Sequence, residues 1–218
     1  MNNHLSKIGP AEREQHFYLK PDHHCYYWGE YTPWMYTQGR NAEFSEVNTF
    51  VADLKMPLEL RGTPQWDRKQ AAIDSAGLAF ARFWRWRELA DKCVLVAVPA
   101  SRSHDDLLYD DRVEQILNRI QYHAGVPLTC LRLLESDGTL QASHSSEQRP
   151  KPAQLVRSIQ INQVPTPAVA PKWVYLFDDV LTSGAHFVAC STHIRKLFPN
   201  TKIIGNFVAR SRRPEADE

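Results

Sequence analysis

The chain has 218 residues, of which 43% are hydrophobic and 23% are charged, and its formal net charge is +1. A chain of this length can bury a substantial core, as one large domain or as one domain with a small appendage. The near-neutral charge excludes a global field that recruits nucleic acid or an anionic membrane. No stretch approaches the roughly 20 apolar residues of a membrane span, and the N-terminus lacks the apolar core of a signal peptide, so we expect a cytoplasmic protein.

The chain contains four cysteines that lie far apart, namely Cys25, Cys93, Cys130 and Cys190. Without a pair at CxxC spacing, the sequence indicates neither a zinc knuckle nor a dense disulfide framework. Cys25 follows two histidines, His23 and His24, but three adjacent side chains do not readily close a tetrahedral metal site. We therefore expect a surface or packing role for this group.

The first part of the chain is rich in aromatic residues and helical patterns. Residues 17–36 combine aromatics with proline and glycine, which predicts short extended pieces joined by turns. Residues 44–55 carry apolar side chains spaced for one helical face, and Pro57 stops that helix. Residues 66–91 show a longer helical pattern. We expect the aromatic segment to form a small cap or hood.

From residue 93 onward, strand and helix patterns alternate. Apolar runs rich in β-branched residues are typical of buried parallel strands. The expected strands are residues 93–98, 126–131, 173–177 and 202–208. The expected helices are residues 105–124, 154–161 and 184–198. A proline-rich connector is expected at residues 164–171.

The alternation predicts an α/β fold in which a parallel sheet is flanked by helices. We expect three parts: a hood at residues 1–60, an α/β core at residues 61–213, and a tail at residues 214–218. A basic cluster lies near the end, at Arg210, Arg212 and Arg213. Because no stacking aromatics neighbour it, we expect a solvated tail rather than a nucleic-acid patch.

Residues 174–184, VYLFDDVLTSG, give the strongest chemical signal. An apolar strand runs into Asp178 and Asp179, at the strand end where open α/β sheets bind ligands. The following helix N-terminus offers unpaired N–H groups to a phosphate, and Gly184 permits close approach. The two carboxylates can accept hydrogen bonds from vicinal ribose hydroxyls, directly or through hydrated Mg²⁺. The pattern predicts a sugar-phosphate site, against the simpler alternative of a solvated strand end.

This segment resembles the motif of type I phosphoribosyltransferases that binds 5-phosphoribosyl-1-pyrophosphate (PRPP). The resemblance implies a phosphoribosyltransferase-like fold with Asp178 and Asp179 as catalytic residues and indirect ligands of Mg²⁺. It also implies that the 5-phosphate is bound by Val180, Leu181, Thr182, Ser183, Gly184, Ala185 and His186. His186 departs from the smaller residue or threonine common in the family, and we expect it on the outer side of the loop.

A short loop follows the strand at residues 93–98. It consists of Pro99, Ala100, Ser101, Arg102 and Ser103. In the family this position cradles the pyrophosphate, and backbone N–H groups, hydroxyls and a guanidinium suit that task. Taken alone, the loop is also explained as an ordinary turn at a strand end.

Within the superfamily the chain is most similar to ComF-type proteins. The similarity includes a helix ending in Leu54-Lys55, a Gln154-Leu155 pair and a closing Phe207–Arg210 stretch, and it covers residues 26–213. The family's N-terminal cysteine-rich zinc module is missing. Residues 105–112 are acidic where the family tends to be basic. We expect them to cap a helix or orient the loop through ion pairs of Asp111 and Arg112, with a second metal site as an alternative.

The resemblance implies a transferase that moves the phosphoribosyl group of PRPP, with Mg²⁺, to a nitrogen nucleophile. The alternative is a PRPP- or nucleotide-binding regulatory or assembly module without turnover, in competence, DNA uptake or defence. A direct nucleic-acid binder is disfavoured by the near-neutral charge. The polar residues 135–152, with His144, Arg149 and Lys151, either close over the site or form a plain connector. The acceptor and the oligomeric state stay open, a homo-oligomer being possible.

Overall fold

A computed structural model describes residues 4–139, 150–165 and 167–214. Its main sheet has the strand order β1-β2-β7-β6-β3. The strands are β1 (Ser6–Lys7), β2 (His24–Tyr31), β7 (Lys202–Ser211), β6 (Trp173–Leu181) and β3 (Cys93–Ala97). The last four are mutually parallel, and β1 pairs antiparallel with β2. The fold class is therefore α/β, with a mixed sheet of mostly parallel strands, as expected.

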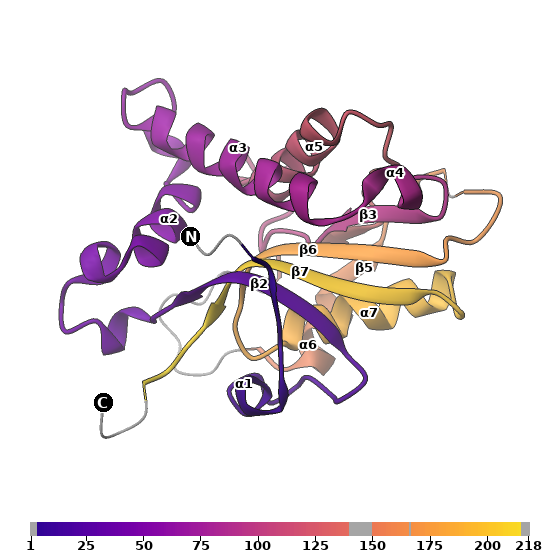
Figure 1. Cartoon of the computed structure of the whole chain (residues 1–218), viewed down its shortest axis with the longest axis horizontal. Coiled ribbons are helices and arrows are strands. Elements are labelled where there is room, and N and C mark those ends of the chain that lie inside the picture. The colour runs from indigo at the N-terminus through magenta and orange to yellow at the C-terminus, as the bar shows by residue number, and fades with distance from the viewer. Residues whose placement is uncertain (1–3, 140–149, 166, 215–218) are drawn as a thin grey trace.

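Helices cover both faces of this sheet (Figure 1). Helices α3 (Trp66–Phe83) and α5 (Arg112–Ala124) lie on one face, and α6 (Pro152–Ser158) and α7 (Ala185–Leu197) lie on the other. Helices α3 and α5 cross closely at Gly77, where a β-carbon would overlap the side chain of Arg119. Because both faces are covered, the β6 residues 174–177 are apolar on both sides and fully buried.

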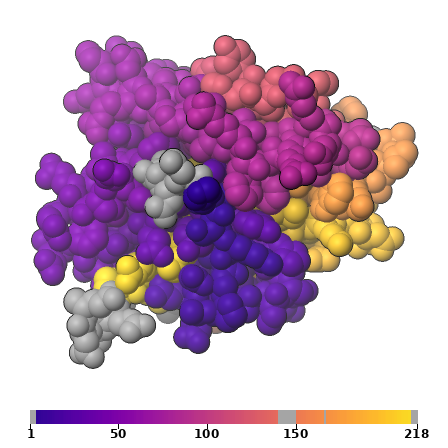
Figure 2. All heavy atoms as spheres, viewed as in Figure 1, coloured from indigo at the N-terminus to yellow at the C-terminus, as the bar shows by residue number. Residues whose placement is uncertain are grey.

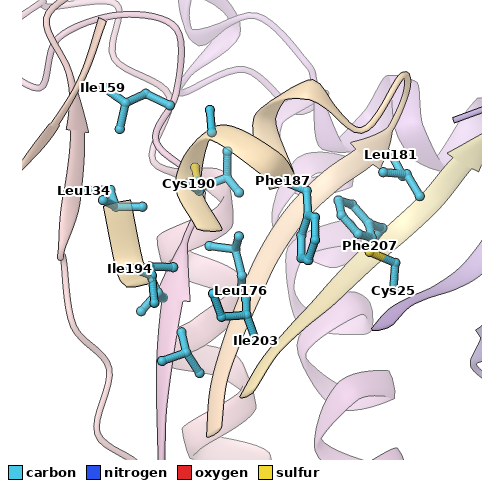
Figure 3. Close-up of a cluster of buried hydrophobic side chains, with 14 of the residues drawn as sticks. Cys25, Leu134, Ile159, Leu176, Leu181, Phe187, Cys190, Ile194, Ile203 and Phe207 are labelled. Atoms are coloured by element: carbon cyan, nitrogen blue, oxygen red, sulfur yellow. The ribbon is translucent and has the colours of Figure 1, made fainter. Parts of the chain in front are cut away.

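The core under α7 fixes where that helix begins. Phe187 in its first turn packs edge to face with Phe207 of β7, next to Cys25 of β2 and Leu181 at the end of β6 (Figure 3). Gly205 admits these rings, because a β-carbon there would lie 2.9 Å from Phe187. The loop from β6 to α7 is therefore held at both of its ends by core side chains.

The N-terminal part of the chain joins the same sheet. After α1 (Pro10–Glu14), strand β2 pairs in parallel with β7 over most of its length. The 3₁₀ turns η1 (Trp34–Tyr36) and η2 (Asn41–Phe44) then lead into α2 (Glu46–Leu54), which lies beyond the carboxyl ends of the strands (Figure 1). Val51 of α2 packs against Val180 and Ala209 there.

The aromatic segment at residues 17–36 thus contributes strand β2 to the sheet, and only its last residues lie over the strand ends. Its aromatic side chains mostly pack: Trp28 contacts Phe80 and Phe83 of α3 edge to face. The division of the chain at residues 60 and 213 stays a prediction. Figure 2 shows the N-terminal residues from residue 4 on, in indigo, at the lower front of the molecule.

Two predicted helices are shorter than expected. The pattern at residues 66–91 breaks at Trp84, whose backbone is extended and whose indole donates to Asn206 at 2.9 Å; α4 (Trp86–Leu89) follows as a separate turn. The helix expected from residue 105 starts only at Arg112. Asp106 accepts the N–H of Leu108 at 2.8 Å, so its side chain stabilises a turn in place of capping a helix.

The remaining expectations hold in part. Residues 126–131 make only one bridge, between Cys130 and Leu95, instead of a full strand. The range 154–161 divides into the end of α6 and strand β5 (Ile159–Ile161), which pairs with β4 (Leu134–Ser136). A short helix η3 (Leu58–Leu60) follows α2. In the described ranges no helix has both the length and the apolar character to cross a membrane.

Candidate functional site

The site begins where β6 extends beyond the end of its neighbour β3. The last bond between them runs from the N–H of Val98 to the carbonyl of Phe177, at 2.8 Å. Strand β6 continues to Leu181 because β7 still pairs with it, Leu181 lying opposite Arg210. The next two residues of β6, Asp178 and Asp179, are therefore left without a strand on the β3 side.

A pocket of about 770 Å³ opens on that side. Its walls come from four segments that are far apart in the sequence. They are residues 55–59 after α2, residues 98–103 after β3, residues 106–114 before and within α5, and the end of β6 with the start of α7. Gly138 also borders the pocket. The fold thus brings the two loops singled out by sequence to one cavity.

Most of the predicted ligand-binding residues border this pocket. All five residues of the predicted pyrophosphate loop, 99–103, line it. From the second segment, five residues do so: Asp178, Asp179, Val180, Thr182 and His186. The others, Leu181, Ser183, Gly184 and Ala185, are buried and are not among the residues that line the pocket. His186 faces the pocket, so its expected position on the outer side of the loop is wrong.

Asp179 forms ion pairs with two basic side chains. One carboxylate oxygen accepts from Nε of Arg112 at 2.9 Å and from a second nitrogen of that guanidinium. The other lies 3.2 Å from Nζ of Lys55 and accepts the N–H of Val180 at 2.5 Å. Burial acts to raise the pKa of Asp179, but Lys55 and Arg112 outweigh it and hold that pKa well below its usual range. Asp179 is therefore a buried, ionised anchor for two cations.

Asp178 has a different environment although it is the adjacent residue. It is half-buried, and one of its oxygens accepts the N–H of Asp179 at 2.8 Å. Burial and the neighbouring charge of Asp179 raise the pKa of Asp178 to about 7. Within the described residues, no side chain donates to it. Asp178 is thus the acid of the pair that is free to meet a ligand, whereas the sequence predicted equal roles.

A chain of ion pairs extends from Asp179 into the protein. Arg112 also pairs with Asp110 at 2.8 Å, and Asp110 pairs with Nζ of Lys69 at 2.6 Å. Lys69 is completely buried and also donates to the carbonyl of Met56 at 3.0 Å. The network links Asp179 of β6 to residues 110–112, to Lys69 of α3 and to Met56 after α2. Arg112 forms ion pairs with Asp179 and Asp110, neither of which belongs to the 99–103 loop, and no ion pair of Asp111 is found among the described residues. That Asp111 and Arg112 orient the loop stays a prediction.

Sequence reasoning missed Lys69 and gave Lys55 no role in the site. Lys69 does carry a signal, because it shares the spacing i, i+3, i+4, i+7 with the buried residues Ala72, Ile73 and Ala76 of α3. A lysine in a buried helical stripe needs an acidic partner, which could have been sought. Lys55 carries no comparable signal, since it reaches Asp179 only through the packing of α2 on β6.

The turn between β6 and α7 has its backbone N–H groups free. Gly184 precedes α7 with φ +86°, a conformation that favours glycine. Among the described residues, no backbone carbonyl accepts from Ser183, Gly184, Ala185 or His186. Unpaired amides at a helix N-terminus suit an anion. Burial lowers the pKa of His186, so a neutral imidazole stands at the pocket edge.

The loop at residues 99–103 is contacted by residues 136–138. Ser136 Oγ lies 3.2 Å from the carbonyl oxygen of Ser101, to which it donates. Gly138 adopts φ +74° and packs against the backbone of Ser103. Arg102 at the pocket wall pairs with Asp106 at 2.8 Å. Asp106 is thus an ion-pair partner of the predicted pyrophosphate loop.

The acidic residues do not form a metal cage. In residues 4–139, 150–165 and 167–214 no three histidine, cysteine or acidic side chains are arranged to hold an ion. Cys25 is buried in the core. The free carboxylate oxygen of Asp178 suits the indirect contact expected for an Mg²⁺ ion that keeps its waters and a ligand's phosphates. His144 and Arg149 lie outside the described residues.

The pocket combines free backbone amides, one available carboxyl and two anchored cations at the carboxyl edge of a parallel sheet. Comparison with known proteins adds no name to this geometry: no family model matches the chain, and no curated protein matches it.

Proposed function

We propose that the chain binds PRPP or another ribose 5-phosphate compound in this pocket, as a phosphoribosyltransferase-type protein. The observation that carries the proposal is the shared cavity: residues 99–103 and the segment from Asp178 to His186 border the same pocket of about 770 Å³. That volume lies within the range of small-molecule sites. The two loops could hold the two ends of one ligand.

Each part of the ligand has a suitable partner. The free N–H groups at residues 183–186 suit the 5-phosphate. Asp178 suits the ribose diol, since no cation in the described part of the chain lies at hydrogen-bonding distance from its carboxyl. Arg112 and Lys55 carry positive charge at the wall of the pocket and suit the pyrophosphate together with residues 99–103. This assignment gives Asp179 the task of placing the two cations.

The chemistry would be transfer of the phosphoribosyl group. The C1–O bond breaks with its electron pair leaving on the pyrophosphate, and a nitrogen nucleophile forms the C1–N bond and loses a proton. Arg112 and the 99–103 loop would stabilise the leaving group, and Asp178 would lie near the cationic ribose. Mg²⁺ bound with PRPP neutralises pyrophosphate charge. No covalent protein nucleophile is required, because positioning and electrostatics supply the rate.

The test is release of pyrophosphate from PRPP and Mg²⁺ with a panel of amines and bases. Asp178→Asn together with Asp179→Asn should abolish release, and unchanged release would remove both residues from the mechanism. Arg82→Gln is a matched control, since this charged residue lies at the end of α3 and does not border the pocket.

A second function is a sensor or assembly module that binds PRPP without turnover. The ion pairs of Asp179 with Lys55 and Arg112 favour this second function. A site that binds a ligand without reacting with it can keep these charged side chains in fixed positions. Calorimetric titration with PRPP separates the two functions. Binding without pyrophosphate release favours the sensor.

A further inference from the structure

The outer side of the turn between β6 and α7 is covered by residues 9–19, here called the N-terminal strap. We propose that this strap turns two peptide groups of the turn so that their N–H groups face a bound phosphate, with His16 as the positioning residue. The inference rests on the proposed function and deepens it, because it assigns a new part of the chain to the phosphate site.

Three contacts join the strap to the turn. Nδ1 of His16 bonds the carbonyl of Thr182, and the N–H of Tyr18 donates to the carbonyl of Ser183 at 3.1 Å. A carbonyl only accepts hydrogen bonds, so Nδ1 carries the proton. Leu19 lies against Gly184, where an added β-carbon would be 2.8 Å from the leucine side chain. Two consecutive carbonyls are thus held on the strap side.

The orientation of the amides follows from peptide geometry. In a trans peptide the C=O and N–H groups point in opposite directions, and the described residues contain no cis peptide. The carbonyls of Thr182 and Ser183 share their peptide groups with the N–H groups of Ser183 and Gly184. Those two N–H groups therefore point away from the strap, and no described carbonyl accepts from them. Thr182 at the start of the turn and His186 after it border the pocket.

His16 is suited to this task by its burial. Its side chain is completely buried, and burial, with a smaller contribution from the charge of Arg210, lowers its pKa. The imidazole is therefore neutral at physiological pH. Its Nε2 has no hydrogen-bond partner within the described residues, so the bond to Thr182 is the polar contact that holds the ring.

The strap is attached independently of His16. Gln15 exchanges two hydrogen bonds with the backbone of Arg213, at 2.9 and 3.0 Å. The N–H of Ile8 donates to the carbonyl of Cys25 at 2.9 Å, and Leu19 is buried in the core. Replacing the imidazole should therefore leave the strap in place and change only the hold on Thr182.

The test measures binding of ribose 5-phosphate and of magnesium pyrophosphate to the full chain by calorimetry. His16→Leu fills much of the space but cannot donate, whereas His16→Asn places an amide nitrogen near the position of Nδ1. We expect His16→Leu to weaken ribose 5-phosphate binding about tenfold, the effect of about one hydrogen bond. His16→Asn should retain affinity within about threefold, and Gln15→Ala is the control within the strap. Pyrophosphate binding should be equal in all four proteins.

The outcomes are distinct. Equal affinity of His16→Leu and wild type for ribose 5-phosphate overturns the role of His16 while the proposed function stands. Equal losses for both ligands, or a Gln15→Ala loss as large as that of His16→Leu, show general loosening and also overturn it. If wild type binds no ribose 5-phosphate, the proposed function fails and this inference with it. Should His16→Leu not fold, a large loss in the folded His16→Asn variant rejects the donor role.

Discussion

The ion pair between Arg112 and Asp179 provides the sharpest test of the electrostatics of the pocket. Arg112→Met keeps part of the apolar stem and removes the guanidinium. Asp179, whose side chain is 7% exposed, then retains the more exposed Lys55 at 3.2 Å as its cation, together with the N–H of Val180. A nearly buried carboxylate would lose one of its two cationic partners.

The magnitude follows from the cost of breaking a buried pair. Removing one partner of such a pair costs about 3–5 kcal/mol. Because Lys55 remains, we place the loss at the lower end, about 3 kcal/mol, which corresponds to a fall in Tm of about 6–12 °C for a chain of this size.

The loss should depend on pH. The wild-type pKa of Asp179 is lowered, so its contribution to stability is present above the unfolded pKa of about 4 and is lost as pH falls through the lower native pKa. In Arg112→Met this carboxyl has a higher pKa and takes up a proton more readily. The difference in Tm between the two proteins should therefore shrink from pH 7.5 to pH 4.5.

Thermal unfolding followed by circular dichroism at these two pH values measures the effect. The double variant Arg112→Met with Asp179→Asn is the control, and it should recover part of the loss because no buried charge is left unpaired. A fall in Tm below about 2 °C at pH 7.5, or an equal fall at both pH values, would refute the reasoning.

Three further changes test other parts of the site. Asp178→Asn should raise Tm more at pH 8 than at pH 5. Burial and Asp179 raise the pKa of Asp178 to about 7, so the stability held by its protonated form is lost as pH rises from the unfolded pKa of about 4 to that value; an equal or larger rise at pH 5 would contradict this. Gly184→Ala should cost about 1–3 kcal/mol in urea unfolding, since φ is +86° there, and an unchanged midpoint argues against the turn described. Lys69→Met should cost about 3 kcal/mol, because it leaves Asp110 with one cation instead of two, and a neutral effect in the same assay would show that the buried lysine is dispensable.

Strand and helix positions in the core could be predicted because burial on both sides leaves a clear pattern. Residues 174–177 are apolar without alternation, as a covered parallel strand requires, and the structure places them in β6, between β7 and β3. The helix after Gly184 was equally clear. The late start of α5 could not be predicted. The side chain of Asp106 accepts the N–H of Leu108 in a turn instead of capping a helix, and the sequence does not distinguish these two uses of an aspartate.

The candidate site could be located from sequence but its charges could not be assigned. Asp178 and Asp179 are identical in type and adjacent, so no pattern distinguishes them. Their environments differ because, of the two, Asp179 is the one that pairs directly with Lys55 and Arg112, through packing of α2 and α5 at the end of β6. The strap contact of His16 is equally invisible, since it joins residues far apart in the chain and follows from the path between β1 and β2.

The central claim is that the turn after β6 binds a sugar phosphate through its main-chain amides. The most direct measurement is a titration of the ¹⁵N-labelled protein with ribose 5-phosphate, followed by two-dimensional NMR. We predict saturable shifts of the amide signals of Ser183, Gly184, Ala185 and His186, with Asp178 among the next most affected. Saturable binding with these signals unmoved, or no binding at millimolar ligand, would contradict the account.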